Sequence, residues 1–201
     1  CVQPGVSNSV RAAIKKLGGL VEDMAPVAYP FAKARSVENQ RDNKHCRYGK
    51  LRIWNMTKYA KIIYLDADMI VLRNIDELFR YPELSAVPDK YPGIFNSGLM
   101  VIEPNENTSR EMMDSYMDTT SYNKGDQGFL NAFFSKRAGS VATTHHTKLS
   151  FQPLRPHFNM PIWLRRSALG KQINDSDIAV IHFTAEIKPW SFYWRRHKDF
   201  A

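Results

Sequence analysis

Two carboxylates one residue apart directly follow a short apolar run. Asp66 and Asp68 stand in the segment "KIIYLDADMIVL", where a hydrophobic stretch ends and another begins. Asp is rarely buried without a partner, and two close carboxylates repel each other, so the pair needs a compensating positive charge. A divalent cation supplies one, because Mg²⁺ and Mn²⁺ favour carboxylate oxygens. The pattern predicts a metal site, although surface turns also contain such pairs.

A histidine and a lysine near the end of the chain fit the same chemistry. His182 ends the apolar run "DIAVIHF" and begins "HFTAEIKPW", which contains Lys188. Mn²⁺ also accepts imidazole nitrogen, and a lysine has the reach to meet a diphosphate. A metal and a lysine together can neutralise the charge that grows on a departing nucleotide diphosphate. The combination predicts a nucleotide-sugar leaving group, while a structural role for His182 is the alternative.

Two further polar clusters interrupt apolar stretches. Asn96 and Ser97 stand in "FNSG" at the entry of an expected strand, and Asp126 and Gln127 stand in "GDQG" at the start of an expected helix. Ordinary turn and capping chemistry is the favoured interpretation of each cluster taken singly, because these residue types favour such positions.

The elements that must position these residues alternate between helix and strand. The segment 7–19 has hydroxyl caps, helical apolar spacing and a glycine stop, and the segment 20–24 after it is expected to be a strand. The run 61–65 suits a strand covered on both faces, as in a parallel sheet. Ligands gather beyond the carboxyl ends of strands in open α/β sheets, which is where Asp66 and Asp68 are expected.

Composition narrows the class of protein. The 201 residues are 43% hydrophobic, which is enough for one core, so we expect a single domain over residues 1–201. The net charge of +8 favours anionic partners, or else a solvated basic face. No RNA-binding or zinc-finger pattern occurs, so nucleic acid is not expected. No apolar run is long enough for a bilayer span, so no integral membrane segment is expected either. The abrupt start at Cys1 suggests an N-terminally incomplete chain.

Five ordered motifs carry a resemblance to a known family. They run from about Tyr48 to Trp190 and read "YGKLRIWNMTKYAKIIYLDADMIVLRNIDELF", "LSAVPD", "FNSGLMVIEP", "GDQGFLNAFF" and "HFTAEIKPW". Together they resemble glycosyltransferase family 8, in its glycogenin-like branch with plant glucuronosyltransferases. The resemblance implies a GT-A fold, an α/β domain with a mostly parallel central sheet flanked by helices. The family's first strand would precede the start of this chain.

The resemblance also implies an activity. It is the retaining transfer of a hexose or hexuronic acid from a UDP-sugar to a glycan or other hydroxyl acceptor, with Mn²⁺, or Mg²⁺ in its place. By position, Asp66, Asp68 and His182 would bind the metal, and Lys188 would bind the diphosphate. The expected donor-sugar contacts are Lys50, Asn96, Ser97, Asp126 and Gln127, with Asp126, Gln127 and Lys188 as the catalytic residues. Ala185 stands where the family usually has glycine and is expected to let the backbone approach the donor.

Several alternatives stay open at this point. A chain without the first strand could be a nucleotide-sugar-binding or scaffold protein with weak or no transferase activity. The donor sugar is open between glucose, glucuronic acid and galactose, and attack from the front face competes with a covalent sugar on Asp126. A homodimer is left open. Asn-x-Ser/Thr triplets at Asn55, Asn107 and Asn174 leave the Golgi lumen and the cytoplasm both open.

Overall fold

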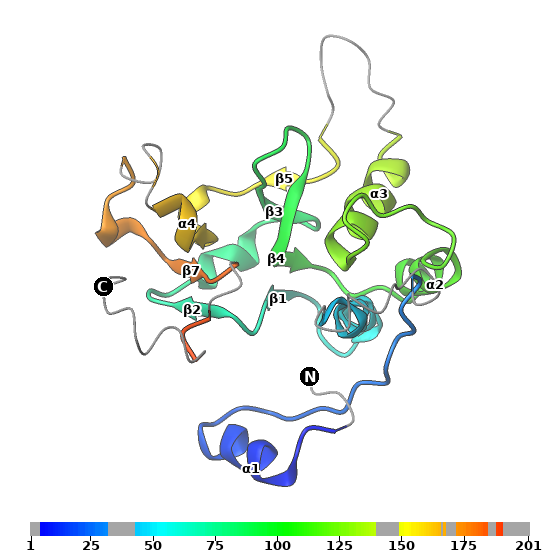
Figure 1. Ribbon diagram of the computed structural model, residues 1–201, viewed down its shortest axis with the longest axis horizontal. Coiled ribbons are helices and arrows are strands. Elements are labelled where there is room, and N and C mark those ends of the chain that lie inside the picture. Colours follow the sequence, from blue (N-terminus) through cyan, green and yellow to red (C-terminus); the bar gives the residue numbers. More distant parts are fainter. Residues whose placement is uncertain are drawn as a thin grey trace. The chain divides into compact units, whose positions relative to one another are not determined.

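The computed structural model of the 201-residue chain describes residues 5–31, 43–139, 149–165, 167, 172–184 and 188–190 (Figure 1). Its internal contacts divide the chain into two compact units. Unit 1 comprises Cys1–Ala60 and Pro104–Gly139, and unit 2 comprises Lys61–Glu103 and Ser140–Ala201. Each unit is described by itself below. Of the site residues predicted from sequence, Asp66, Asp68 and His182 belong to unit 2, whereas Lys50 and Asp126 belong to unit 1.

Unit 1 is helical in its described part. Its helices are α1 (Asn8–Lys16), the 3-10 helix η3 (Asn43–Asn55), α2 (Glu106–Ser115) and α3 (Asp126–Arg137). The hydroxyl of Ser7 caps α1 by accepting a hydrogen bond from Val10 N at 3.4 Å, as the sequence predicts. The prediction of a strand at residues 20–24 is wrong. Within this segment only Asp23 takes part in β pairing, as an isolated β-bridge.

The core of unit 1 forms where η3 contacts α2 and α3. Tyr48, Leu51 and Trp54 of η3 are fully buried, and their spacing of three residues matches the three residues per turn of a 3-10 helix. The Trp54 ring lies 5.9 Å from that of Phe134, and the Tyr48 ring 6.2 Å from that of Phe129, both on α3. This packing fixes Lys50, which lies between Tyr48 and Leu51 in the chain.

Unit 2 contains the strands. They are β1 (Ile62–Leu65), β2 (Met69–Val71), β3 (Ser85–Pro88), β4 (Phe95–Ile102), β5 (Gln152–Pro153), β6 (Met160–Pro161) and β7 (Val180–His182). They form one sheet in the order β1-β4-β3-β5 and another in the order β2-β7-β6. The short helices of this unit are η4 (Asp76–Arg80), η5 (Pro156–Phe158), α4 (Ile162–Arg165) and η6 (Asp175–Asp177).

The direction of the strand pairs corrects one expectation. The α/β class is confirmed, but β1 pairs antiparallel with β4, and β2 pairs antiparallel with β7. The β3–β4 pair is antiparallel too, and the parallel pairs among the described strands are β3–β5 and β6–β7. A short apolar run indicates that both faces of a strand are covered, and it carries no information about the direction of its neighbours.

The core of unit 2 holds β4 and β7 in place. Leu99 and Val101 of β4 pack in one buried cluster with Val180 of β7, Leu78 of η4 and Phe158 of η5. Leu65, the last residue of β1, packs against the same cluster, which therefore supports β1, β4 and β7 together. The polar residues at these ends gain fixed backbone positions from it.

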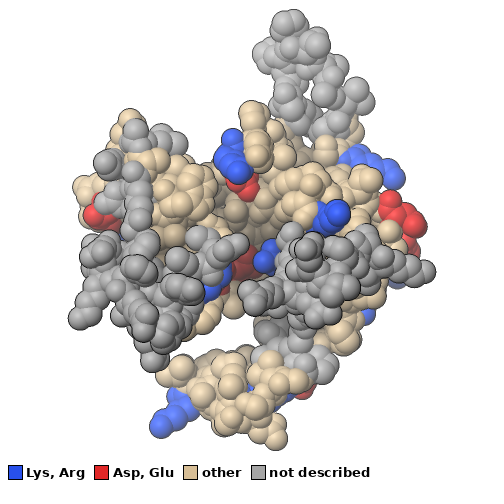
Figure 2. All heavy atoms as spheres, in the orientation of Figure 1, with Lys and Arg blue, Asp and Glu red and all other residues tan. Residues whose placement is uncertain are grey.

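Two further features of the described residues are the distribution of their basic side chains and the character of their helices. On the face drawn in Figure 2, the Lys and Arg side chains of the described residues lie in several separate groups. No helix in the described part of the chain combines the length and the apolar character that crossing a bilayer requires.

Candidate functional site

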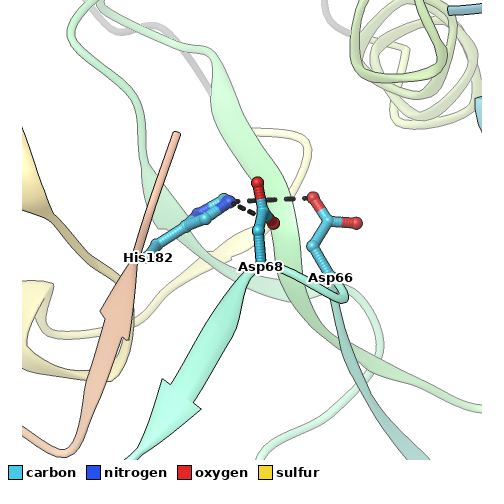
Figure 3. Close-up of side chains that lie close together, drawn as sticks. All are labelled: Asp66, Asp68 and His182. Atoms are coloured by element: carbon cyan, nitrogen blue, oxygen red, sulfur yellow. Dashed lines mark ion pairs between the residues drawn. The ribbon is translucent and has the colours of Figure 1, made fainter. Parts of the chain in front are cut away.

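The strands of unit 2 bring three side chains together from distant parts of the sequence. Asp66 and Asp68 lie in the turn between β1 and β2, and His182 is the last residue of β7 (Figure 3). The antiparallel register pairs Met69 with His182, which sets the imidazole beside that turn. Two backbone bonds fix the turn, from Asp66 N to Gly98 O at 2.8 Å and from Phe183 N to Asp68 O at 2.9 Å.

The three side chains converge closely enough to share a metal ion. One ligand atom from each of Asp66, Asp68 and His182 lies within 4.8 Å of the others. His182 Nε2 is 3.3 Å from Asp68 Oδ1 and 3.8 Å from Asp66 Oδ2. Atoms that bind Mg²⁺ at about 2.1 Å lie within about 4.2 Å of one another, so small side-chain rotations suffice to complete the set. Two carboxylates and one imidazole are ligands that suit Mn²⁺.

Lys188 completes the charge pattern of this cluster. Its Nζ donates a hydrogen bond to Asp68 Oδ2 at 2.5 Å and another to the backbone oxygen of Phe183. Partial burial alone would raise the pKa of the Asp68 carboxyl, but the neighbouring His182 and the hydrogen bond from Lys188 outweigh it and hold that pKa well below its usual range. Among the described side chains of this cluster, two carboxylates stand beside one lysine, which pairs with Asp68, and such a group of acidic side chains favours a bound cation.

Solvent can reach the carboxylate side of the cluster. The side chains of Asp66 and Asp68 are 29% and 21% exposed, whereas that of His182 is 5% exposed. Tyr64 OH donates a hydrogen bond to Asp66 Oδ1 at 2.6 Å and leaves Asp66 Oδ2 facing His182. The His182 side chain is thus enclosed by protein, and the two carboxylates lie towards the solvent.

A second charged group predicted from sequence lies in unit 1. Lys50 Nζ is 2.6 Å from Asp126 Oδ2, and both side chains are almost completely buried. Asp126 lies in the first turn of α3, where the helix dipole favours a negative charge. The adjacent Tyr48 OH donates to Gly125 O at 3.2 Å, and burial raises the pKa of Tyr48 to about 12. These contacts connect η3 to the start of α3.

The remaining predicted site residues have individual surroundings. Asn96 Oδ1 accepts a hydrogen bond from Gly98 N at 2.9 Å and another from Asn159 Nδ2 at 2.9 Å. Ser97 is buried on β4. Gln127 Nε2 donates to Tyr122 OH at 2.7 Å on the surface of unit 1. Ala185 lies outside the described residues.

Sequence reasoning missed two residues that contact His182. Asn159 is 1% exposed, and its Oδ1 lies 2.8 Å from His182 Nδ1. Gly98 faces the same ring, since a Cβ added there would lie 2.3 Å from His182 Cε1. The one signal for Asn159 is a polar residue inside the mostly apolar stretch "FNMPIW", which is too common to single it out.

Comparison with solved structures defines the class of fold. The galactosyltransferase LgtC, solved with donor and acceptor sugar analogues, matches with a TM-score of 0.62 at 20% identity, over 98% of this chain and 81% of that one. The glycosyltransferase GlyE of Streptococcus pneumoniae matches with a TM-score of 0.59 at 17% identity, over 92% of this chain and 46% of that one. The fold is therefore that of the GT-A glycosyltransferases, as the sequence predicts.

Comparison with known sequences defines the family. Residues 3–193 match the model of glycosyl transferase family 8. Glycogenin-1 of Caenorhabditis elegans is 33% identical over 92% of this chain and 42% of its own length. Inositol phosphorylceramide glucuronosyltransferase 1 of Arabidopsis thaliana is 34% identical over 96% of this chain and 36% of its own length. The chain belongs to glycosyl transferase family 8 and spans less than half the length of these two relatives.

Proposed function

We propose that this chain carries the catalytic region of a retaining glycosyltransferase, which moves a hexose or hexuronic acid from a UDP-sugar to a hydroxyl acceptor with the help of Mn²⁺. The observation that carries the proposal is the convergence of Asp66, Asp68 and His182, with Lys188 on Asp68, in a chain of family 8. The similarity to a glycogenin and to a plant glucuronosyltransferase supports glucose and glucuronic acid as the donor sugars to test first.

The proposed roles follow from the chemistry of the side chains. Asp66, Asp68 and His182 hold the divalent cation, which offsets the negative charge of the donor diphosphate when it is bound. Lys188 turns from Asp68 towards the same diphosphate and stabilises the negative charge that grows there. Its position at 2.5 Å from Asp68 supports this role, because a flexible lysine on a metal ligand needs only a side-chain rotation to reach what the metal binds.

The reaction exchanges one carbon–oxygen bond for another. The bond between the anomeric carbon of the sugar and the β-phosphate oxygen breaks, and its electron pair leaves with UDP. The acceptor oxygen forms the new bond to the anomeric carbon, and its proton passes to a phosphate oxygen of the leaving UDP or to solvent. Because UDP leaves as an anion, the positive charges that surround its diphosphate lower the barrier to this step.

The other site residues keep their proposed roles toward the donor sugar. Lys50, Asn96, Ser97, Asp126, Gln127 and Ala185 are proposed on their positions in the family motifs. The close pairing of Lys50 with Asp126 supports a role for Lys50 in orienting that carboxylate. Asp126 and Gln127 are the residues proposed to act at the anomeric carbon, where a carboxylate can attack or orient and an amide can orient or polarise.

A screen of UDP-sugars tests the proposed function. Purified protein is incubated with UDP-glucose, UDP-glucuronic acid and UDP-galactose, and the release of UDP is measured with Mn²⁺, with Mg²⁺ and with a chelator. We expect release from one donor in preference to the others, dependent on the divalent cation. Equal release with the chelator would reject the role of the metal.

Calorimetry with UDP and Mn²⁺ separates an enzyme from a binding protein. Binding of UDP together with metal-dependent release of UDP from a donor supports the transferase. Binding without any release or transfer from the donors tested supports the scaffold alternative, and the absence of both rejects the proposal.

A further inference from the structure

The buried side of the His182 imidazole is held by an asparagine to which no role has been assigned. Asn159 follows η5 and is 1% exposed, and its Oδ1 is 2.8 Å from His182 Nδ1. The two nitrogens of the imidazole therefore have different surroundings. Nδ1 meets a buried amide, while Nε2 faces the carboxylates of Asp66 and Asp68.

The direction of this hydrogen bond follows from a chain of donors that starts at the backbone. Gly98 N–H can only donate, so the Asn96 atom that it meets at 2.9 Å is the amide oxygen. The same oxygen lies 2.9 Å from the Asn159 side chain, which must meet it with its NH₂ group. Asn159 therefore turns its own oxygen to the ring, and an amide oxygen only accepts. His182 Nδ1 must be the donor.

This assignment decides where the proton of the neutral imidazole lies. A neutral ring has one N–H and one lone pair, and the hydrogen bond made by one nitrogen sets the state of the other. With the proton on Nδ1, the lone pair lies on Nε2. That is the nitrogen 3.3 Å from Asp68 and 3.8 Å from Asp66. Ligating histidines commonly carry such a partner on their second nitrogen.

Close packing supports the same orientation. A Cβ at Gly98 would lie 2.3 Å from His182 Cε1, 2.8 Å from His182 Nδ1 and 2.9 Å from Asn96 Oδ1. The ring and the amide of Asn96 thus both press against the bare backbone of β4. A rotation of the ring would break the bond to Asn159 and leave a buried amide oxygen without its donor, which costs about 1–3 kcal/mol.

We propose that Asn159 is a positioning residue that holds His182 with its proton on Nδ1 and its Nε2 lone pair facing Asp66 and Asp68. The inference rests on the proposed function for its consequence, since the lone pair matters only if a metal binds there. The position of the proton on the His182 ring, however, can be measured without metal. A purely structural asparagine would stabilise the fold without selecting a tautomer.

The first test reads the tautomer directly. Nitrogen NMR of metal-free protein with ¹⁵N-labelled histidine, at a pH where the ring is neutral, distinguishes the two tautomers, and loss of the signal in His182→Gln assigns it. We expect the Nδ1–H form in the wild-type protein and a mixture of tautomers in Asn159→Leu. The Nε2–H form in the wild-type protein overturns the inference, and so does an unchanged tautomer in Asn159→Leu.

The second test uses Mn²⁺ binding and a conservative variant. Asn159→Leu removes the acceptor at similar volume, and we expect Mn²⁺ to bind about 10 to 100 times more weakly. Asn159→Asp restores an acceptor to Nδ1–H, so it should keep the Nδ1–H tautomer and bind Mn²⁺ more tightly than Asn159→Leu. Equal weakening in both variants with the tautomer unchanged indicates a structural role and overturns the inference. If the wild-type protein binds no Mn²⁺, the proposed function fails, and the tautomer measurement still decides the role of Asn159.

Discussion

Two clusters of charged side chains, one in each unit, differ in their burial and in the charges that they bring together. Lys50 and Asp126 in unit 1 form a buried ion pair at 2.6 Å, with side chains that are 5% and 6% exposed. Asp66 and Asp68 in unit 2 are more than 20% exposed; both lie near His182, and Asp68 also pairs with Lys188. The first group is a buried ion pair, whereas the second is a partly exposed cluster with two carboxylates beside solvent.

The difference separates what charges do for stability from what they do for binding. A buried pair with matched charges is costly to break, because removing one partner leaves the other charged and desolvated. A partly exposed cluster with an excess of one sign is poised to take up an ion of the other sign. The family resemblance implied metal binding for the group in unit 2 and donor-sugar contacts for the group in unit 1, and their surroundings predict different responses to mutation.

The largest expected effect is on the stability of unit 1. Lys50→Met removes the ammonium group that pairs with the buried Asp126 carboxylate, and we expect a loss of about 3–5 kcal/mol in the free energy of unfolding. Urea denaturation followed by circular dichroism measures it. The double variant Lys50→Met/Asp126→Leu should regain most of this loss. Glu111→Gln breaks the exposed pair with Arg137 and should cost less than about 1 kcal/mol. A similarly small cost for Lys50→Met would contradict a stabilising role for the buried ion pair.

The next effect in size is on catalysis at the cluster of unit 2. Lys188→Ala should lower turnover about 10² to 10³-fold, because it removes one group that stabilises the transition state. Mn²⁺ binding should not weaken, since the variant removes a positive charge from Asp68. UDP release and metal titration measure the two effects, with Lys90→Ala as the matched control on the exposed surface. A change confined to acceptor affinity would contradict a role at the diphosphate.

The smallest effect is the pH dependence of stability at the same cluster. The pKa of Asp68 is lowered in the folded protein, so its ionised form stabilises the fold above its ordinary pKa of 3.8, and this contribution is lost as the pH falls through the folded value. The free energy of unfolding of the wild-type protein should therefore fall more steeply below about pH 4 than that of Asp68→Asn. Thermal melts across the acidic range compare the two, and parallel curves would show that Asp68 gains nothing from its partners.

Local patterns in the sequence predicted much of unit 2. The apolar runs before Asp66 and before His182 are the strands β1 and β7, and both end where the polar residues begin. Short apolar runs with polar ends carry this information because burial and strand length are local properties. The helix that starts at Asp126 is confirmed for the same reason.

What the sequence could not predict depends on contacts between distant segments. The antiparallel register that pairs Met69 with His182 is one such property. The pairing of Lys50 with Asp126 is another, since neither residue carries a local signal for the other. Asn159 reads as an ordinary polar residue until tertiary structure places it behind His182. Propensity and periodicity do not encode such contacts.

The central claim is that Asp66, Asp68 and His182 form one site for a divalent cation. Titration of metal-free protein with Mn²⁺, followed by electron paramagnetic resonance, tests it most directly in the wild-type protein, in Asp68→Asn and in the exposed control Asp118→Asn. We expect one tight site in the wild-type and control proteins and binding more than about 100-fold weaker in Asp68→Asn, since losing a ligand exceeds the cost of losing a partner of a ligand. Equal affinity in all three proteins would contradict the account.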